Sequence, residues 1–358
     1  MMKSKDRLLI ALNRGIPDRL PATIHQWQPY HLNEFMGGIT DIEAFRKVGL
    51  DAAITCSPFV YEKFPHWGET YEKNGTVTDY TIKTPEGNLT HQVGRNEYTN
   101  WVTKHLIKDY EDIYLIKNYM PVPKLDKQYL SNYYDKLGDD GIMRTFINGY
   151  QGGCWQDACE LYGIEPLIYA VYDNPDWVHE LLNILLDKKL QYIYENLKGA
   201  KVDLVETGGG SSSSTVISPK IHSEFCLPYD IKIHSALHDL GFKVVYHTCG
   251  GMMGILDSIK QNGCDASETL SPKTIGGNIT EHSLVKKELG SKLALIGGLD
   301  QINILTNGTP KQAREEVLNL FKVYGPNGGY IMSACDHFFH APVENIKAYA
   351  DAARECMY

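Results

Sequence analysis

The stretch Lys-Val-Val-Tyr-His-Thr-Cys, at residues 243–249, decides the fold class. It begins with the apolar, β-branched residues of a strand that is buried on both faces, and it ends in two residue types that bind metals. Similar short apolar runs recur along the chain, with helical patterns between them, at residues 21–27, 51–57, 142–148, 202–207, 264–270, 293–299 and 329–335. Eight strands that alternate with helices predict an α/β fold, a single (β/α)₈ TIM barrel that spans residues 1–358 as one domain.

Two of the predicted helices begin with capping residues. Asn174-Pro175-Asp176 combines an N-cap, a first-turn proline and a first-turn acid, and the helical period that follows continues until Gly199. Thr309-Pro310 starts a second helix, which we expect to end before Gly325.

Residues 69–119 interrupt the alternation of strands and helices. Two polar-alternating strands surround Thr84-Pro85-Glu86-Gly87, and a charged helix follows near residues 108–116. This pattern predicts a β-hairpin and helix insertion between strands 2 and 3 of the barrel.

Composition and charge exclude several kinds of partner. The chain has 358 residues, of which 43% are hydrophobic and 22% charged, with a formal net charge of −9. The acidic balance argues against nucleic acid or an anionic membrane as a partner, and no apolar run has the length of a membrane span. The eight cysteines are scattered rather than clustered, so we expect a reducing, cytoplasmic location.

Metal-binding residue types stand at the ends of three predicted strands. His247 and Cys249 share one face of their strand, while Glu268 and Cys335 end two others. Two thiolates, an imidazole and a carboxylate are a suitable tetrahedral set for Zn²⁺, although a single buried cysteine is usually only a small hydrophobic residue. We expect Glu268 to be the exchangeable ligand, because thiolates bind zinc more strongly and an open mouth can solvate the released carboxylate.

Other polar and aromatic residues near strand ends are candidates for the catalytic and substrate sites. Glu206 precedes three glycines and is a candidate proton donor or acceptor, or alternatively a loop anchor. We predict substrate contacts for His25, Trp27, Tyr150 and His337. Arginine and lysine are scarce at strand ends, which favours a neutral or aromatic substrate, unless loops bury these rings.

The chain resembles the uroporphyrinogen decarboxylase superfamily, and within it the corrinoid-linked methyltransferases. The likeness extends over most of the chain and is carried by the segments at residues 7–12, 17–21, 49–52, 218–219, 247–250, 297–300 and 342–352. The His-x-Cys…Cys pattern is similar to the zinc site of the methyltransferase branch. A more distant likeness to cobalamin-independent methionine synthase supports Glu268 as the fourth ligand.

This resemblance implies Zn²⁺, a corrinoid (cobalamin) carried by a partner protein, and a small-molecule methyl donor or acceptor. The neutral and aromatic residues near the strand ends favour a methyl ether or a methylated aromatic compound as the donor. The arginine segment and aspartate of the decarboxylases are absent, because those places contain His25-Gln26-Trp27-Gln28 and Cys56-Ser57-Pro58-Phe59. Three alternatives remain: a methylcorrinoid:thiol (coenzyme M-like) methyltransferase, a non-corrinoid zinc hydrolase, and a metal-binding barrel without catalysis.

Overall fold

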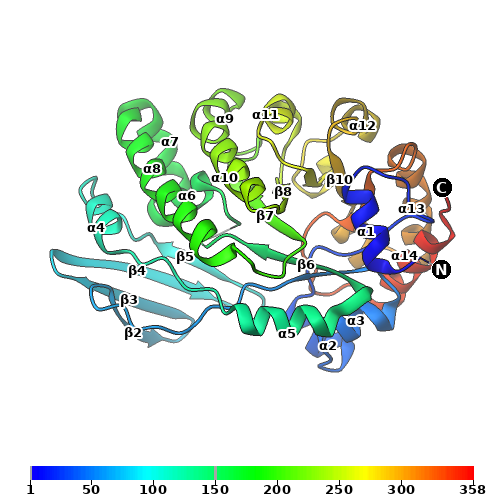
Figure 1. Ribbon diagram of the computed structural model, residues 1–358, viewed down its shortest axis with the longest axis horizontal. Helices are drawn as coiled ribbons and strands as arrows, with labels where there is room; N and C mark the ends of the chain where they lie inside the picture. Colours follow the sequence, from blue (N-terminus) through cyan, green and yellow to red (C-terminus); the bar gives the residue numbers. More distant parts are fainter. Residues whose placement is uncertain (1, 149–150) are drawn as a thin grey trace.

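The computed structural model describes residues 2–148 and 151–358. Its central feature is a curled sheet of seven parallel strands in the order β1-β6-β7-β8-β9-β10-β11 (Figure 1). Each strand overlaps one of the predicted apolar runs, and the bounds are β1 (Ala52–Thr55), β6 (Gly141–Phe146), β7 (Leu204–Gly208), β8 (Lys243–His247), β9 (Ala266–Thr269), β10 (Ala294–Leu299) and β11 (Tyr330–Ala334).

The prediction of a closed eight-stranded barrel is wrong at one position. Among the described residues, segment 21–27 forms no regular strand, and the sheet stays open between β11 and β1. Ala22 makes a single parallel bridge to Met332 of β11, and its carbonyl accepts a hydrogen bond from the Asp51 amide (2.8 Å). Pro21 has no N–H to extend this pairing, so the segment touches each edge of the sheet at only one point.

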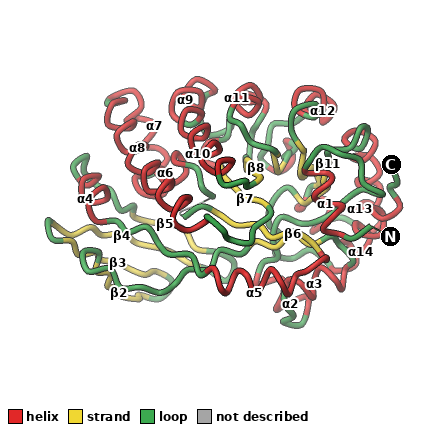
Figure 2. The backbone as a smooth tube through the Cα atoms, in the orientation of Figure 1, coloured by secondary structure: helices red, strands yellow, loops and turns green. Residues whose placement is uncertain are grey.

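Helices lie outside the parallel sheet (Figure 2). The Asn174 side chain caps one of them by accepting from the Trp177 amide, and Thr309 and Gln312 form a capping box on another, as predicted. The helices are α2 (Pro29–Met36), α3 (Asp41–Val48), α5 (Lys127–Leu137), α6 (Cys154–Tyr162), α7 (Ile164–Asp173), α8 (Pro175–Tyr192), α9 (Pro219–Phe225), α10 (Leu227–Asp239), α11 (Leu256–Gln261), α12 (His282–Leu289), α13 (Pro310–Tyr324) and α14 (Val343–Glu355).

The insertion between β1 and β6 is larger than the predicted hairpin. It forms an antiparallel sheet of β2 (Gly68–Asn74), β3 (Val77–Thr84), β4 (Gly87–Arg95) and β5 (Asn100–Lys104), followed by α4 (Asp112–Tyr119). The predicted turn is present, because Thr84 and Gly87 are paired across β3 and β4. This sheet lies at the end of the molecule opposite the two termini (Figure 1).

Helix α1 (Ser4–Leu12) packs against apolar residues of the parallel strands. Its side chains Leu8, Ala11 and Leu12 form one buried cluster with a set of strand residues, namely Ala53, Ile142, Leu204, Val245, Ala266, Ala294, Ile296 and Ile331. This second core is separate from the one beneath the outer helices. We call it the apolar floor, because the functional side chains described below lie two residues further along the same strands.

An ion-pair network holds α1 against the start of β1. Arg7 Nη1 donates to Asp51 Oδ1 (2.8 Å) and Arg7 Nε donates to Asp18 Oδ1 (2.7 Å), while Arg19 also pairs with Asp51. Asp51 is fully buried, so these partners are required to offset its lost hydration. Three of the segments that carry the family resemblance, at residues 7–12, 17–21 and 49–52, therefore contribute to the scaffold.

Within the described residues, no helix is long and apolar enough to cross a membrane.

Candidate metal centre

Four neighbouring strands present a charged or imidazole side chain above the apolar floor. Because side chains alternate along a strand, residues two positions after a floor residue face the same side. The floor residues Ile142, Leu204, Val245 and Ala266 are followed in this way by Arg144 on β6, Glu206 on β7, His247 on β8 and Glu268 on β9. All four are buried, and His247 and Glu268 are direct partners in the β8–β9 register.

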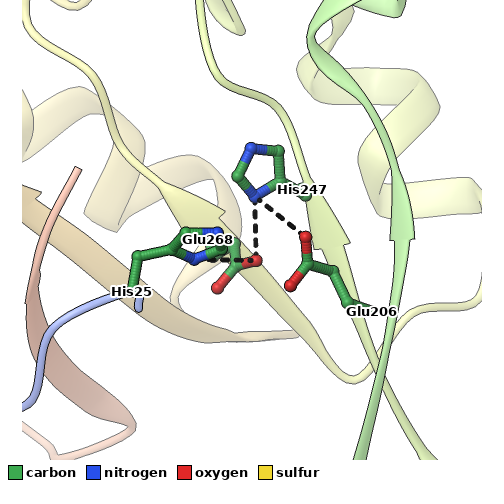
Figure 3. A group of neighbouring side chains, drawn as sticks. All are labelled: His25, Glu206, His247 and Glu268. Atoms are coloured by element: carbon green, nitrogen blue, oxygen red, sulfur yellow. Dashed lines mark hydrogen bonds and ion pairs between the residues drawn. The ribbon is translucent and has the colours of Figure 1, made fainter. Parts of the chain in front are cut away.

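Three of these side chains, Glu206, His247 and Glu268, form a compact cluster with His25 (Figure 3). His247 Nδ1 lies 2.9 Å from Glu268 Oε1 and 3.4 Å from Glu206 Oε1, and His25 Nδ1 lies 3.9 Å from Glu268 Oε1. Each of these residues, His25, Glu206, His247 and Glu268, has one potential ligand atom, and these four atoms lie within 4.8 Å of one another. Zinc–nitrogen and zinc–oxygen bonds of about 2.0–2.2 Å place tetrahedral ligand atoms about 3.4 Å apart. The spacing therefore suits a small divalent metal.

Arg144 supplies the positive charge of the cluster. Its Nη2 atom donates to Glu206 Oε2 (2.5 Å) and to both carboxylate oxygens of Glu268 (2.7 and 2.9 Å). Arg144 was not among the predicted site residues, because it lies inside an apolar run and not at the end of a predicted strand. The pattern Ile142-x-Arg144, parallel to Leu204-x-Glu206, is the signal that identifies it.

The carboxylates have opposite pKa shifts. Burial, with the nearby charge of Glu268, raises the pKa of Glu206 to about 7. Burial also acts to raise the pKa of Glu268, but the Arg144 guanidinium and a hydrogen bond from His247 outweigh it and hold that pKa well below its usual range. Glu206 is therefore the carboxylate of the pair that exchanges a proton near neutral pH.

The imidazoles also differ. Burial lowers the pKa of His25 well below its usual value, so this ring is neutral. For His247, burial acts in the same direction, but Cys249 and the carboxylates of Glu268 and Glu206 outweigh it and raise the pKa.

Three polar atoms of the cluster are buried without a hydrogen-bond partner among residues 2–148 and 151–358. They are Arg144 Nε, Glu206 Oε1 and His247 Nε2. Figure 3 shows the second nitrogen of His247 on the side of the ring away from both carboxylates. Buried polar atoms are normally satisfied, so the unpaired oxygen of Glu206, which lies 3.4 Å from His247 Nδ1, is consistent with a bound cation.

The two predicted sulfur ligands lie at different distances from this cluster. Cys249 is partly exposed and close enough to His247 to affect its pKa. A Cβ at Gly210 would lie 2.7 Å from Cys249 Sγ, so a glycine is needed there. Cys335 is buried, with its thiol 3.8 Å from the Leu270 carbonyl oxygen. In the part of the chain that the structure describes, the group of potential ligand atoms within 4.8 Å of one another includes neither sulfur.

The predicted substrate residues are separated by the fold. The His25 ring lies 4.9 Å from the His247 ring and 5.1 Å from the His337 ring, and the His337 side chain is 35% exposed. Trp27 lies elsewhere: it is buried and packs against Phe45 and Phe338. Tyr150 lies outside the described residues.

The cluster contains residue types that bind metals, and it lies towards the carboxyl ends of parallel strands. Enzymes of the α/β-barrel class have their active sites at this end of the strands. The chain belongs to the uroporphyrinogen decarboxylase (URO-D) family, whose model matches residues 3–356. This confirms the family resemblance seen in the sequence.

Two relatives from Methanosarcina mazei are methyltransferases. A methylated-thiol–coenzyme M methyltransferase is 26% identical over 207 residues, which cover 55% of this chain and 50% of the relative. A methylcobamide:CoM methyltransferase is 23% identical over 270 residues, or 72% of each chain. This chain therefore spans half of the first relative's length. A solved methyltransferase structure from the same organism shares the fold, with a TM-score of 0.69 at 18% identity and 99% coverage of both chains.

Proposed function

We propose that this protein is a zinc-dependent methyltransferase that moves a methyl group between a small molecule and a corrinoid carried by a partner protein. The observation that carries the proposal is the buried group of His25, Glu206, His247 and Glu268, the last three of which lie on the neighbouring strands β7, β8 and β9. Relatives named for methyl transfer from methylcobamide or from methylated thiols support the reaction class.

The proposed zinc ligands are His247, Cys249, Glu268 and Cys335. Support comes from the closeness of Cys249 to the His247 ring and from the placement of Glu268 2.9 Å from His247 Nδ1. When bound, zinc supplies a Lewis acid that activates a substrate sulfur or oxygen. Glu206 has a pKa of about 7 and is the group that accepts or donates the substrate proton.

An uncharged methyl donor, possibly a methyl ether or a methylated aromatic compound, is the proposed substrate. Arg144 is the cation of the cluster, and both carboxylates already occupy it. An anionic substrate group would have to compete with them for the guanidinium. His25, whose ring is neutral, lies between the His247 ring and the partly exposed His337 ring. A second candidate, methyl transfer to a thiol, is favoured by the coenzyme M activity named for the relatives.

Metal analysis tests the site. Purified protein should contain about one zinc per chain, and Cys335→Ala should lower this content sharply. Cys264→Ala is the matched control, because Cys264 is also a buried free thiol but lies at the opposite end of β9 from the site. Wild-type zinc content in the Cys335 variant would remove that residue from the ligand set.

Spectroscopy tests the reaction. The zinc-loaded protein is incubated with a panel of methyl ethers, methylated aromatic compounds and methylated thiols in the presence of Co(I) cobalamin, and the cobalt absorption reports methylation. Methylation from an uncharged donor supports the first candidate, and methylation confined to thiol compounds supports the second. Turnover of a donor without any corrinoid would favour the hydrolase alternative.

A further inference from the structure

Arg144 pairs with both carboxylates of the cluster through one nitrogen atom. Nη2 contacts Glu206 at 2.5 Å and the two oxygens of Glu268 at 2.7 and 2.9 Å. Arg144 is 2% exposed, and its Nε atom has no hydrogen-bond partner in residues 2–148 and 151–358. The guanidinium group is therefore committed to these two carboxylates.

The burial of Glu268 changes the expected cost of ligand exchange. The sequence analysis assumed that an open mouth solvates this carboxylate after displacement, but Glu268 is only 2% exposed. A buried carboxylate without a partner has a high free energy, so it does not leave a cation readily unless another positive group receives it. Arg144 already contacts both of its oxygens, and this arrangement provides that group.

We propose that Arg144 is a positioning residue that keeps Glu268 exchangeable: it holds this carboxylate beside His247 and stabilises it as a paired anion when a substrate sulfur or oxygen takes its place. The inference rests on the proposed function, because it requires a metal at His247 and Glu268. According to this proposal, the replacement of Glu268 by substrate depends on a residue that is not itself a metal ligand.

This role and a purely structural role predict different results. Without Arg144, the cluster retains two buried carboxylates and less positive charge, so it binds a divalent cation at least as tightly. Glu268 then has no partner after release and keeps its position against an incoming ligand. Metal affinity is retained while substrate affinity falls. A residue that only supported the fold would affect both affinities in the same direction.

Cobalt substitution measures the two affinities separately. Co²⁺ replaces zinc because its visible spectrum reports ligand exchange, and 2-mercaptoethanol is the thiol probe. We expect Arg144→Met to retain one cobalt per chain, with the Kd for the thiol raised about tenfold or more, the scale of a lost charge-assisted hydrogen bond. Arg144→Lys retains the charge but donates from a single compact ammonium group. Its Kd for the thiol should lie between the values of wild type and Arg144→Met.

Two further variants separate this role from folding. Arg144→Met/Glu206→Gln removes one cation and one anion together, which restores the buried charge balance but still leaves Glu268 unpaired, so its thiol Kd should rise as in the single variant. Arg7→Met is the matched control, because Arg7 is equally buried and also bridges two carboxylates, Asp18 and Asp51. It should lower thermal stability and leave the thiol Kd unchanged.

The outcomes are distinct. An unchanged thiol Kd in folded Arg144→Met or in the double variant overturns the inference, and so does a parallel loss of cobalt and thiol affinity. Wild-type protein that binds no cobalt overturns the proposed metal site, and the role of Arg144 with it.

Discussion

Asp230 on α10 provides a quantitative test of the packing behind β8, the strand of His247. It is 3% exposed, and its Oδ2 atom has no hydrogen-bond partner within the described parts of the chain. Its carboxylate interacts with Tyr246, the residue before His247 on β8. Burial raises the pKa of Asp230 to about 7 from a usual value of 3.8, despite the hydrogen bond from Tyr246 and the charge of Lys189.

The sign of the effect follows from proton linkage. The folded state binds this proton more tightly than the unfolded state, so Asp230 costs no stability below the unfolded pKa. Stability is lost as the pH rises from about 4 to about 7, and the full penalty applies above that range. The difference between the folded and unfolded pKa values corresponds to about 4 kcal/mol in the free energy of unfolding. Asp230→Asn keeps the shape and removes the ionisation, so the variant should be more stable than wild type by up to about 4 kcal/mol at pH 8.

Urea denaturation at pH 5 and pH 8 measures the difference. At pH 5 part of the penalty is already present, so the stability gain of Asp230→Asn should grow by about 2–3 kcal/mol between the two pH values. Asp265→Asn is a control of opposite sign. Although burial acts to raise the pKa of Asp265, its hydrogen bonds from Lys243 and His238 outweigh this and lower it. That variant should lose stability at pH 8. A pH-independent difference between Asp230→Asn and wild type would refute the reasoning.

Two further results are expected. Asp51→Asn leaves Arg7 and Arg19 without their shared buried carboxylate, so the free energy of unfolding should fall by about 3–5 kcal/mol. Thermal melting measures this, and a melting temperature within experimental error of wild type would contradict it. Uroporphyrinogen should release no CO₂ in the presence of the protein, because residues 25–28 and 56–59 contain neither an arginine nor an aspartate; measurable CO₂ would reverse the choice of branch.

Local patterns were enough to predict most of the scaffold. A strand buried on both faces requires a continuous apolar run wherever it occurs, and seven of the eight runs coincide with the seven strands of the parallel sheet. The N-caps at Asn174 and Thr309 were predictable for the same reason, since a cap bonds to the backbone two or three residues away. The family resemblance was also present in the sequence, and the match over residues 3–356 confirms it.

The failures of prediction concern contacts between distant segments. Whether segment 21–27 closes the barrel depends on the distance between β11 and β1 in the curled sheet. The apolar pattern of the segment itself gives no information about that distance. The two outer strands of the insertion were not predicted, because they pair with β3 and β4 without a buried apolar face of their own; every residue of β2 is exposed.

The candidate site divides in the same way. Glu206, His247 and Glu268 were predictable, because each lies near the carboxyl end of an apolar run. Active sites of parallel α/β folds lie at the carboxyl ends of the strands. The position of Arg144 follows from the same spacing, but its role does not, since that role depends on two carboxylates that follow it by 62 and 124 residues. The sequence alone indicated which strands present the clustered side chains. The tertiary structure decided which charges meet, because electrostatic pairing in a buried site acts over a few ångströms of space and is independent of separation along the chain.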